Sequence, residues 1–227
     1  MEDFAQIIKS LFEPSSEIRQ ILGVTLRMAA TSTAISFALG LAFGALIGSN
    51  EFKLKRAVMG VTSTLMGLPP VLAGLVIFFL LSRSGPLGEY KLLYSVTAMV
   101  CAQVLLITPV VTNMTATVLG SRKNEMSETM RGIGLPRHTQ MLLMLRECRA
   151  ELFATLLLGF GRAISEVGAA QLVGGNIQYK TRVMTTAIVL ETNKGNFGMA
   201  LAIGVLLLVV ALIINVAARA LQRGAND

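Results

Sequence analysis

Long apolar runs separated by short polar segments dominate the 227-residue chain. Each run is long enough to cross a hydrocarbon core as a helix, which takes about 20 residues. The five predicted spans lie near 22–48, 57–82, 92–119, 152–175 and 198–220. Because lipid offers the backbone no hydrogen-bond partners, such runs must be helical. The pattern predicts an all-α integral membrane protein, with residues 1–227 forming a single transmembrane domain.

Composition supports this class and argues against a nucleic-acid partner. Hydrophobic residues make up 53% of the chain and charged residues 15%, and the mean hydropathy is +0.66, which is typical of membrane proteins. The net charge is +7, but the basic residues lie between the spans and form no module with stacking aromatic residues. The lipid bilayer is therefore the expected environment.

The inventory of reactive side chains excludes most enzymes and metal sites. Asp3 and Asp227 are the only aspartates and His138 is the only histidine, so metal clusters and Ser-His-Asp triads cannot be assembled. Cys101 lies within the third span and Cys148 in a connecting segment, and we expect both to be free thiols.

One segment approaches the pattern of a phosphate-binding loop without matching it. In GGNIQYKT (174–181), Tyr179 stands where G-x-x-x-x-G-K-[ST] requires its second glycine. We therefore expect no cofactor and no bound ATP in this chain. Active transport would draw its energy from a partner protein or an ion gradient.

The distribution of Lys and Arg predicts the orientation of the chain in the membrane. The connecting segments on one side hold eleven of these residues and those on the other side hold eight. The richer set comprises 49–56, 120–151 and 221–227 with Arg219, and the poorer set comprises 1–21, 83–91 and 176–197 with Arg27. We therefore expect the N-terminus outside the cell and the C-terminus in the cytoplasm.

Glycines and prolines mark two of the predicted spans. Gly40, Gly44 and Gly48 recur every four residues in the first span, which either lets a neighbouring helix approach closely or is simply tolerated. Pro69 and Pro70 remove two backbone donors from the second span and must bend or break it. Broken helices persist in membranes where they face protein or a water-filled cavity, so this break is a candidate lining of a pathway.

Polar side chains in the third and fourth spans are further candidates for a pathway. Thr108, Thr112 and Thr115, in the span that also contains Pro109, share one helix face and either line a pathway or hydrogen-bond to another helix. In the fourth span, Arg162 and Glu166 lie one helical turn apart, where charges are costly and usually functional. They form either a polar element of the pathway beside Ser165, whose hydroxyl can donate to an oxyanion, or an internal ion pair.

The polar segment 120–151 is too long for a simple connection between spans. It is predicted to form two short amphipathic helices, the first capped by Asn124 and ended by the pair Gly132 and Gly134, and the second beginning at Pro136. Such helices can be pushed by another protein, or they can lie along the lipid headgroups.

The segment between the fourth and fifth spans is predicted to contain a short external helix or a re-entrant piece. The apolar run 183–190 is too short to cross the membrane. The nearby Lys180, Arg182 and Lys194 either steer an anion or an acidic partner, or are ordinary solvated charges.

Several segments resemble the inner-membrane permeases of ATP-binding-cassette (ABC) importers. ETMRGIG (128–134) is similar to the EAA motif of that family, although the Leu-Pro that follows in the family is absent. GLPPVLAGLVIFFLLSRSGPLG (67–88), GRAISEVGAAQLVGGNI (161–177) and KTRVMTTAIVLETNKGNFGMALAIG (180–204) resemble the molybdate, tungstate and sulfate branch, and 182–191 is most similar to tungstate permeases.

The resemblance implies a type I ABC importer permease that translocates an oxyanion across the plasma membrane by alternating access. The implied partners are a second copy of this chain, two cytoplasmic ATPase subunits that bind ATP and magnesium, and an extracytoplasmic oxyanion-binding protein. The implied docking residues are Glu128, Thr129, Met130, Gly134, Pro136 and Arg137. The candidate pathway residues are Pro69, Pro70, Thr108, Thr112, Arg162, Ser165, Glu166 and Gly168.

Two further functions remain open from the residues themselves. A stand-alone anion channel or ion-coupled carrier would need no ATPase, but it would give the segment 120–151 no function. A membrane-embedded enzyme is disfavoured by the missing Asp and His constellations. Tungstate, molybdate and sulfate are similar tetrahedral dianions, so physical reasoning does not choose among them.

Overall fold

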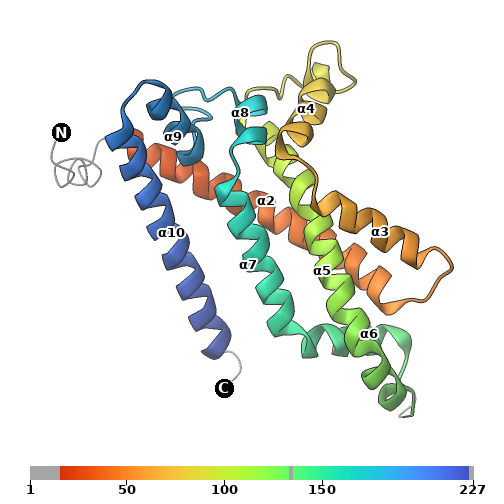
Figure 1. The fold of residues 1–227 in the computed structure, drawn as a ribbon. Coiled ribbons are helices and arrows are strands. Elements are labelled where there is room, and N and C mark those ends of the chain that lie inside the picture. Colours follow the sequence, from red (N-terminus) through yellow and green to blue (C-terminus); the bar gives the residue numbers. More distant parts are fainter. Residues whose placement is uncertain (1–15, 133–134, 225–227) are drawn as a thin grey trace. The chain divides into compact units, whose positions relative to one another are not determined.

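The computed structural model describes residues 16–132 and 135–224, and in these ranges it contains helices and turns but no strand (Figure 1). The elements are α2 (Ser16–Ser49), α3 (Lys55–Met66), α4 (Pro70–Leu81), the 3-10 helix η1 (Gly88–Tyr90), α5 (Val96–Gly132), α6 (Arg137–Glu147), α7 (Arg149–Ser165), α8 (Gly168–Gly174), α9 (Met184–Asn193) and α10 (Phe197–Gly224). The predicted all-α fold class is confirmed for this part of the chain.

Three helices are long and apolar enough to cross a membrane, and two bent pairs bring the number to five if each pair forms one span. The three continuous spans are Glu17–Ser49, Val96–Lys123 and Phe197–Ala220. The pairs are α3 with α4 and α7 with α8, each bent by more than 40°. The predicted break at Pro69 and Pro70 is confirmed, because α4 begins at Pro70.

Two predictions of helix boundaries are wrong. The fourth span, 152–175, is not one helix, because α7 ends at Ser165 and α8 starts at Gly168. The first short helix predicted after Asn124 is also not separate, because α5 continues from the membrane span to Gly132. Gly120 alone costs a helix only about 1 kcal/mol and does not end it. The second short helix is confirmed as α6, with Pro136 at its N-cap.

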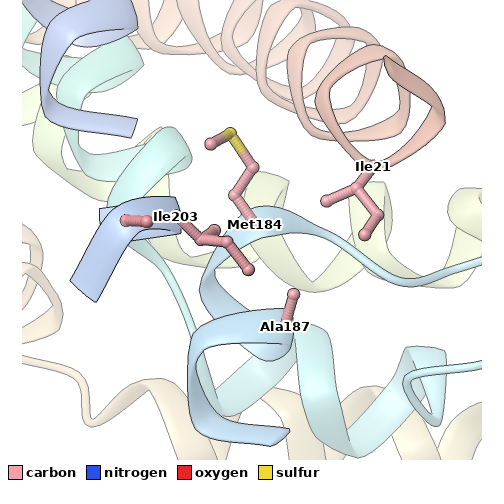
Figure 2. Packing of buried hydrophobic residues seen from close by; sticks show 5 residues of the cluster. Ile21, Met184, Ala187 and Ile203 are labelled. Atoms are coloured by element: carbon pink, nitrogen blue, oxygen red, sulfur yellow. The ribbon is translucent and has the colours of Figure 1, made fainter. Parts of the chain in front are cut away.

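The chain divides into two compact units, which are described separately, and α2, α5 and α7 each contribute residues to both. The described residues of unit 1 are 16–32, 69–103 and 161–224. Its core joins Ile21 of α2, Met184 and Ala187 of α9, and Ala202 and Ile203 of α10 (Figure 2). The short helix α9, predicted within 178–195, packs along α10 and is anchored by Met184, which is 1% exposed.

Unit 2 comprises 33–68 and 104–160. Its core joins Ala45 of α2 and Leu119 of α5 to Met144, Cys148 and Leu152, at and beside the junction of α6 and α7. Burial raises the pKa of the Cys148 thiol, with a further contribution from Glu151. Cys148 thus behaves as a small apolar side chain in this core. Both described cysteines are free, as expected, and Cys101 is exposed.

The glycine series of α2 forms its contact with α5 in unit 2. A Cβ on Gly40 would lie 2.6 Å from Val111 Cβ, and one on Gly44 would lie 2.5 Å from Thr115 Cβ. A Cβ on Gly48 would lie 2.9 Å from the carbonyl oxygen of Ala116. These distances leave no room for a side chain, so the close-approach interpretation of the glycines is confirmed.

Replacing Gly44 by Ala should destabilise unit 2, because its Cβ would also lie 2.7 Å from the carbonyl oxygen of Thr112 and the backbones would have to separate. We expect a loss of about 1–3 kcal/mol in the free energy of unfolding, measured through thermal exposure of Cys148 to a thiol-reactive dye in a Cys101→Ser background. Gly23→Ala is the matched control, because no atom lies within 4 Å of a Cβ on Gly23 of the same helix. Equal melting temperatures for the two variants would contradict the close contact.

Candidate translocation site and coupling segment

The second halves of the two broken spans, α4 and α8, pack against each other in unit 1 (Figure 1). A Cβ on Gly74 would lie 2.8 Å from Ala169 Cα, and one on Gly168 would lie 2.9 Å from Val71 Cγ2. Small residues on both helices therefore permit this contact. The structure brings Gly168 next to the start of α4 at Pro70, two positions predicted independently as pathway candidates.

The start of α4 follows from its two prolines. Pro69 is the N-cap, in an extended conformation, and Pro70 is the first helical residue, where a missing N–H costs nothing because that position has no partner inside the helix. The Pro69 carbonyl accepts hydrogen bonds from the N–H groups of Leu72 at 3.0 Å and Ala73 at 3.2 Å. The chain thus begins a new helix at this point.

Glu166 lies in the break between α7 and α8 and is 8% exposed. Its side-chain Oε1 accepts a hydrogen bond from the N–H of Ala169 at 3.1 Å, and its backbone carbonyl accepts one from Thr185 Oγ1 at 2.9 Å. The carboxylate therefore accepts one N–H of the first turn of α8, next to the N-cap residue Val167. An anion near a helix N-terminus is favourable because it offsets the free N–H groups there.

The internal ion pair predicted as one role of Arg162 and Glu166 is absent from the ion pairs of the described residues. That prediction assumed an unbroken helix, in which residues four apart face each other. Since α7 ends at Ser165, Glu166 leaves the helical path and turns to α8 instead. The guanidinium of Arg162 is half-buried and has no hydrogen-bond or ion-pair partner within the described ranges.

Ser165 closes the last turn of α7. Its hydroxyl lies 2.9 Å from the carbonyl oxygen of Gly161 and 3.2 Å from that of Arg162, and donates to one or the other. The side chain is exposed at the surface of unit 1. The hydroxyl can donate to a ligand when it gives up this local bond.

A buried amide that sequence reasoning missed joins three helices at the same break. Gln103 of α5 and Ser32 of α2 are 0% exposed. The Ser32 hydroxyl donates to Gln103 Oε1, and Gln103 Nε2 donates to the carbonyl oxygen of Ala163 in α7 at 2.8 Å. The signal was present, because Gln103 is an amide in the middle of the third span, where polar groups are usually functional.

Thr108 and Thr112 belong to unit 2 and not to the unit that holds the break. Thr112 is 4% exposed and contributes its backbone to the contact with Gly44. The hydroxyls of Thr108 and Thr115 are buried and find no hydrogen-bond partner within the described ranges, so the predicted interhelical hydrogen bond is not observed for these two. A pathway role for Thr108 and Thr112 stays a prediction.

Two of the three basic residues considered for anion steering are paired. Arg182 Nη1 lies 2.8 Å from Glu17 Oε1, and Lys194 Nζ lies 2.8 Å from Glu191 Oε1. Pairing cancels most of the field that each cation would extend toward an anion. This favours the interpretation of these residues as ordinary loop charges.

The predicted docking residues lie at the junction of α5 and α6. Glu128, Thr129 and Met130 belong to the last turns of α5. Pro136 caps α6 and Arg137 is its first residue. Gly134 lies outside the described residues. The docking role of all six stays a prediction.

Glu51 ties the α2–α3 connection to α5 near the end of its membrane span. Glu51 Oε1 lies 2.8 Å from Lys123 Nζ and 2.9 Å from Lys55 Nζ. The hydrogen bond from Lys123, followed by that from Lys55, lowers the pKa of Glu51 from 4.5 to about 2. The carboxylate thus stays ionised at neutral pH and links the connection to α5 within unit 2.

These features define a multi-spanning helical membrane protein with two sharply bent helix pairs. The chain belongs to the family of binding-protein-dependent transport system inner membrane components, whose family model matches residues 40–227. This family consists of transport permease subunits, which work with a substrate-binding protein and an ATPase. Membership places the chain among the multi-pass proteins of the inner membrane.

Three relatives are similar over most of their length. A tungstate uptake system permease of Peptoclostridium acidaminophilum is 38% identical, over 97% of both chains. A tungstate uptake system permease of Campylobacter jejuni is 33% identical, over 98% of this chain and 93% of its own. A probable anion ABC transporter permease of Haloferax volcanii is 38% identical, over 86% of both chains.

The Glu51 bridge predicts a pH dependence of stability. Because the folded-state pKa lies below the ordinary value, the stabilisation is complete above about pH 4.5 and is lost as the pH falls toward the folded pKa of about 2. We expect Glu51→Gln to lower the melting temperature slightly at pH 7, by an amount that salt reduces, since the Glu51 side chain is 70% exposed. Circular dichroism should show this difference shrinking at pH 3.

Glu89→Gln is the control for this measurement, since Glu89 is exposed and takes part in no ion pair with another described residue. A difference between wild type and Glu51→Gln that is the same at pH 3 and pH 7 would refute the role of the ionised carboxylate.

Proposed function

We propose that this chain is the permease subunit of an ABC importer for tungstate, a tetrahedral oxyanion, and that it works by alternating access. The observation that carries the proposal is its likeness to the two tungstate uptake permeases, each of which spans more than nine-tenths of this chain. The two broken spans support a pathway, because non-helical backbone within a membrane is tolerated where it lines a cavity or is buried in protein.

The proposed pathway passes the break between α7 and α8. The N-terminus of α8 already has an anion, since the Glu166 carboxylate accepts an N–H of its first turn. Arg162, which has no partner in the described part of the chain, is then the cation available to an oxyanion, and Ser165 can add a hydroxyl donor. Arginine suits this role because its guanidinium donates to two oxygens at once.

The proposed assembly contains two copies of this chain, two cytoplasmic ATPase subunits and one extracytoplasmic binding protein. The ATPases bind ATP and magnesium and dock on the segment 120–151 around Glu128 and Gly134. ATP-driven closure pushes this segment, and the attached spans open the pathway inward. This arrangement requires the N-terminus outside and the C-terminus in the cytoplasm, as the distribution of basic residues favours.

The function is tested by elemental analysis of cells that lack the gene, grown in trace tungstate and molybdate, against cells with the gene restored. We expect the deletion to abolish tungsten accumulation and to leave molybdenum and sulfur unchanged. Loss of molybdenum or sulfur accumulation instead would support an ABC importer with a different oxyanion as its substrate. Unchanged accumulation of all three elements would refute oxyanion import.

The alternative of a stand-alone anion channel or carrier is separated by reconstitution. Proteoliposomes that contain this chain with its ATPase and binding protein should accumulate tungstate only when ATP is supplied. Tungstate entry into liposomes that contain this chain alone would establish the alternative.

Arg162→Gln should slow tungstate uptake about tenfold at saturating loaded binding protein, because a hydrogen bond to a charged group contributes about 1.5–3 kcal/mol. Arg162→Lys keeps the positive charge and should retain a larger part of the rate. The measurement is initial uptake in the reconstituted assembly, normalised to the amount of permease. Wild-type uptake by Arg162→Gln would remove Arg162 from the pathway.

A further inference from the structure

The break between α7 and α8 leaves carbonyl groups that a continuous helix would satisfy. In such a helix the N–H of Val167 would donate to the carbonyl of Ala163, four residues earlier. Here α7 ends at Ser165, and Gln103 Nε2 takes the place of that N–H at 2.8 Å. Ala163 is 0% exposed, so its carbonyl is shielded from bulk water.

A second carbonyl of the break is also satisfied by a side chain from another helix. Thr185 of α9 donates to the carbonyl oxygen of Glu166 at 2.9 Å and is 5% exposed. The third acceptor of this region, the carbonyl of Arg162, lies within reach of Ser165 on α7 itself. Polar side chains of α5 and α9 therefore hold the break in unit 1.

Packing alone does not explain the polar side chains at this break. An unbroken helix through 166 and 167 would satisfy the same backbone groups without any side chain, whereas buried polar groups in a membrane are costly. The Ser32 hydroxyl, which donates to Gln103 Oε1, adds a third polar side chain that serves the break. Since these residues stabilise the broken form of the helix, we expect the break itself to have a functional role.

We propose that Gln103 and Thr185 are positioning residues for oxyanion translocation. They hold the break, and with it the last turn of α7, so that Arg162 and Ser165 face the translocated anion. This inference rests on the proposed function for the identity of the anion, but the holding of the break does not depend on that identity. Neither residue touches the anion; each acts through a backbone carbonyl.

The test is hydrogen exchange of the peptide 163–170 in Gln103→Met, which keeps the length of the side chain and removes its amide. Without this amide, the Ala163 carbonyl regains the N–H of Val167, and the helix extends. We expect one amide of the peptide to become protected in the variant. A purely structural loss of packing would move exchange in the opposite direction, so faster or unchanged exchange would overturn the proposal.

Transport in the reconstituted assembly is measured for the same variants as hydrogen exchange. Tungstate uptake by Gln103→Met should fall about tenfold at an equal amount of permease, since the hydrogen bond that holds the break is lost and the extended helix no longer holds Arg162 and Ser165 toward the anion. The matched control is Asn113→Leu on the same helix, which removes the bonds from Asn113 Nδ2 to Thr62 Oγ1 at 3.1 Å and to the Met59 carbonyl in unit 2. We expect normal exchange at 163–170 and a smaller loss of uptake for this control.

Thr185→Val is the second variant, should Gln103→Met fail to fold, because valine has the same shape as threonine without the hydroxyl. It should slow uptake in the same direction at a normal amount of protein. Protection at 163–170 with wild-type uptake in both variants would overturn the proposal, because the break would then have no role in transport. If the wild type moves no oxyanion, the proposed function falls, and the exchange result alone decides whether Gln103 holds the break.

Discussion

The need to pair every backbone N–H and C=O within lipid governs this structure. The continuous spans α2, α5 and α10 meet it with their own helical bonds. The two broken spans meet it in different ways. At Pro69 and Pro70 the chain removes the donors themselves, so fewer groups need partners. At Glu166 the donors remain, and side chains from two other helices satisfy the carbonyls.

This difference explains what could be predicted from the sequence. Apolar runs located all five candidate spans, because length and hydropathy are local properties. The break at Pro69 was predicted, since a proline disrupts a helix through its own missing N–H, without help from distant residues. The break after Ser165 was missed, because it depends on Gln103, which is 60 residues away in the chain. No pattern within 152–175 contains that information.

The sequence predicted which residues form the candidate site better than it predicted how they are arranged. Arg162, Ser165, Glu166 and Gly168 do lie at one break, but the expected pairing of Arg162 with Glu166 assumed a helix that the structure does not have. The Glu166 carboxylate instead accepts a hydrogen bond from the N–H of Ala169 in α8. The charge balance of the site is consequently different from the one that sequence spacing indicates, with the cation left unpaired among the described residues.

The bonds of Gln103 also have a consequence for how the protein meets its lipid. They fix α2, α5 and α7 to one another at a single depth, so these helices cannot slide past each other at that level. A thicker or thinner bilayer must then be accommodated elsewhere, by the helix ends or by tilt. The helix α10, of whose most apolar window only 17% is buried, takes no part in these bonds. Bilayer thickness should therefore act on this permease through α10, and leave the level of Gln103 unchanged.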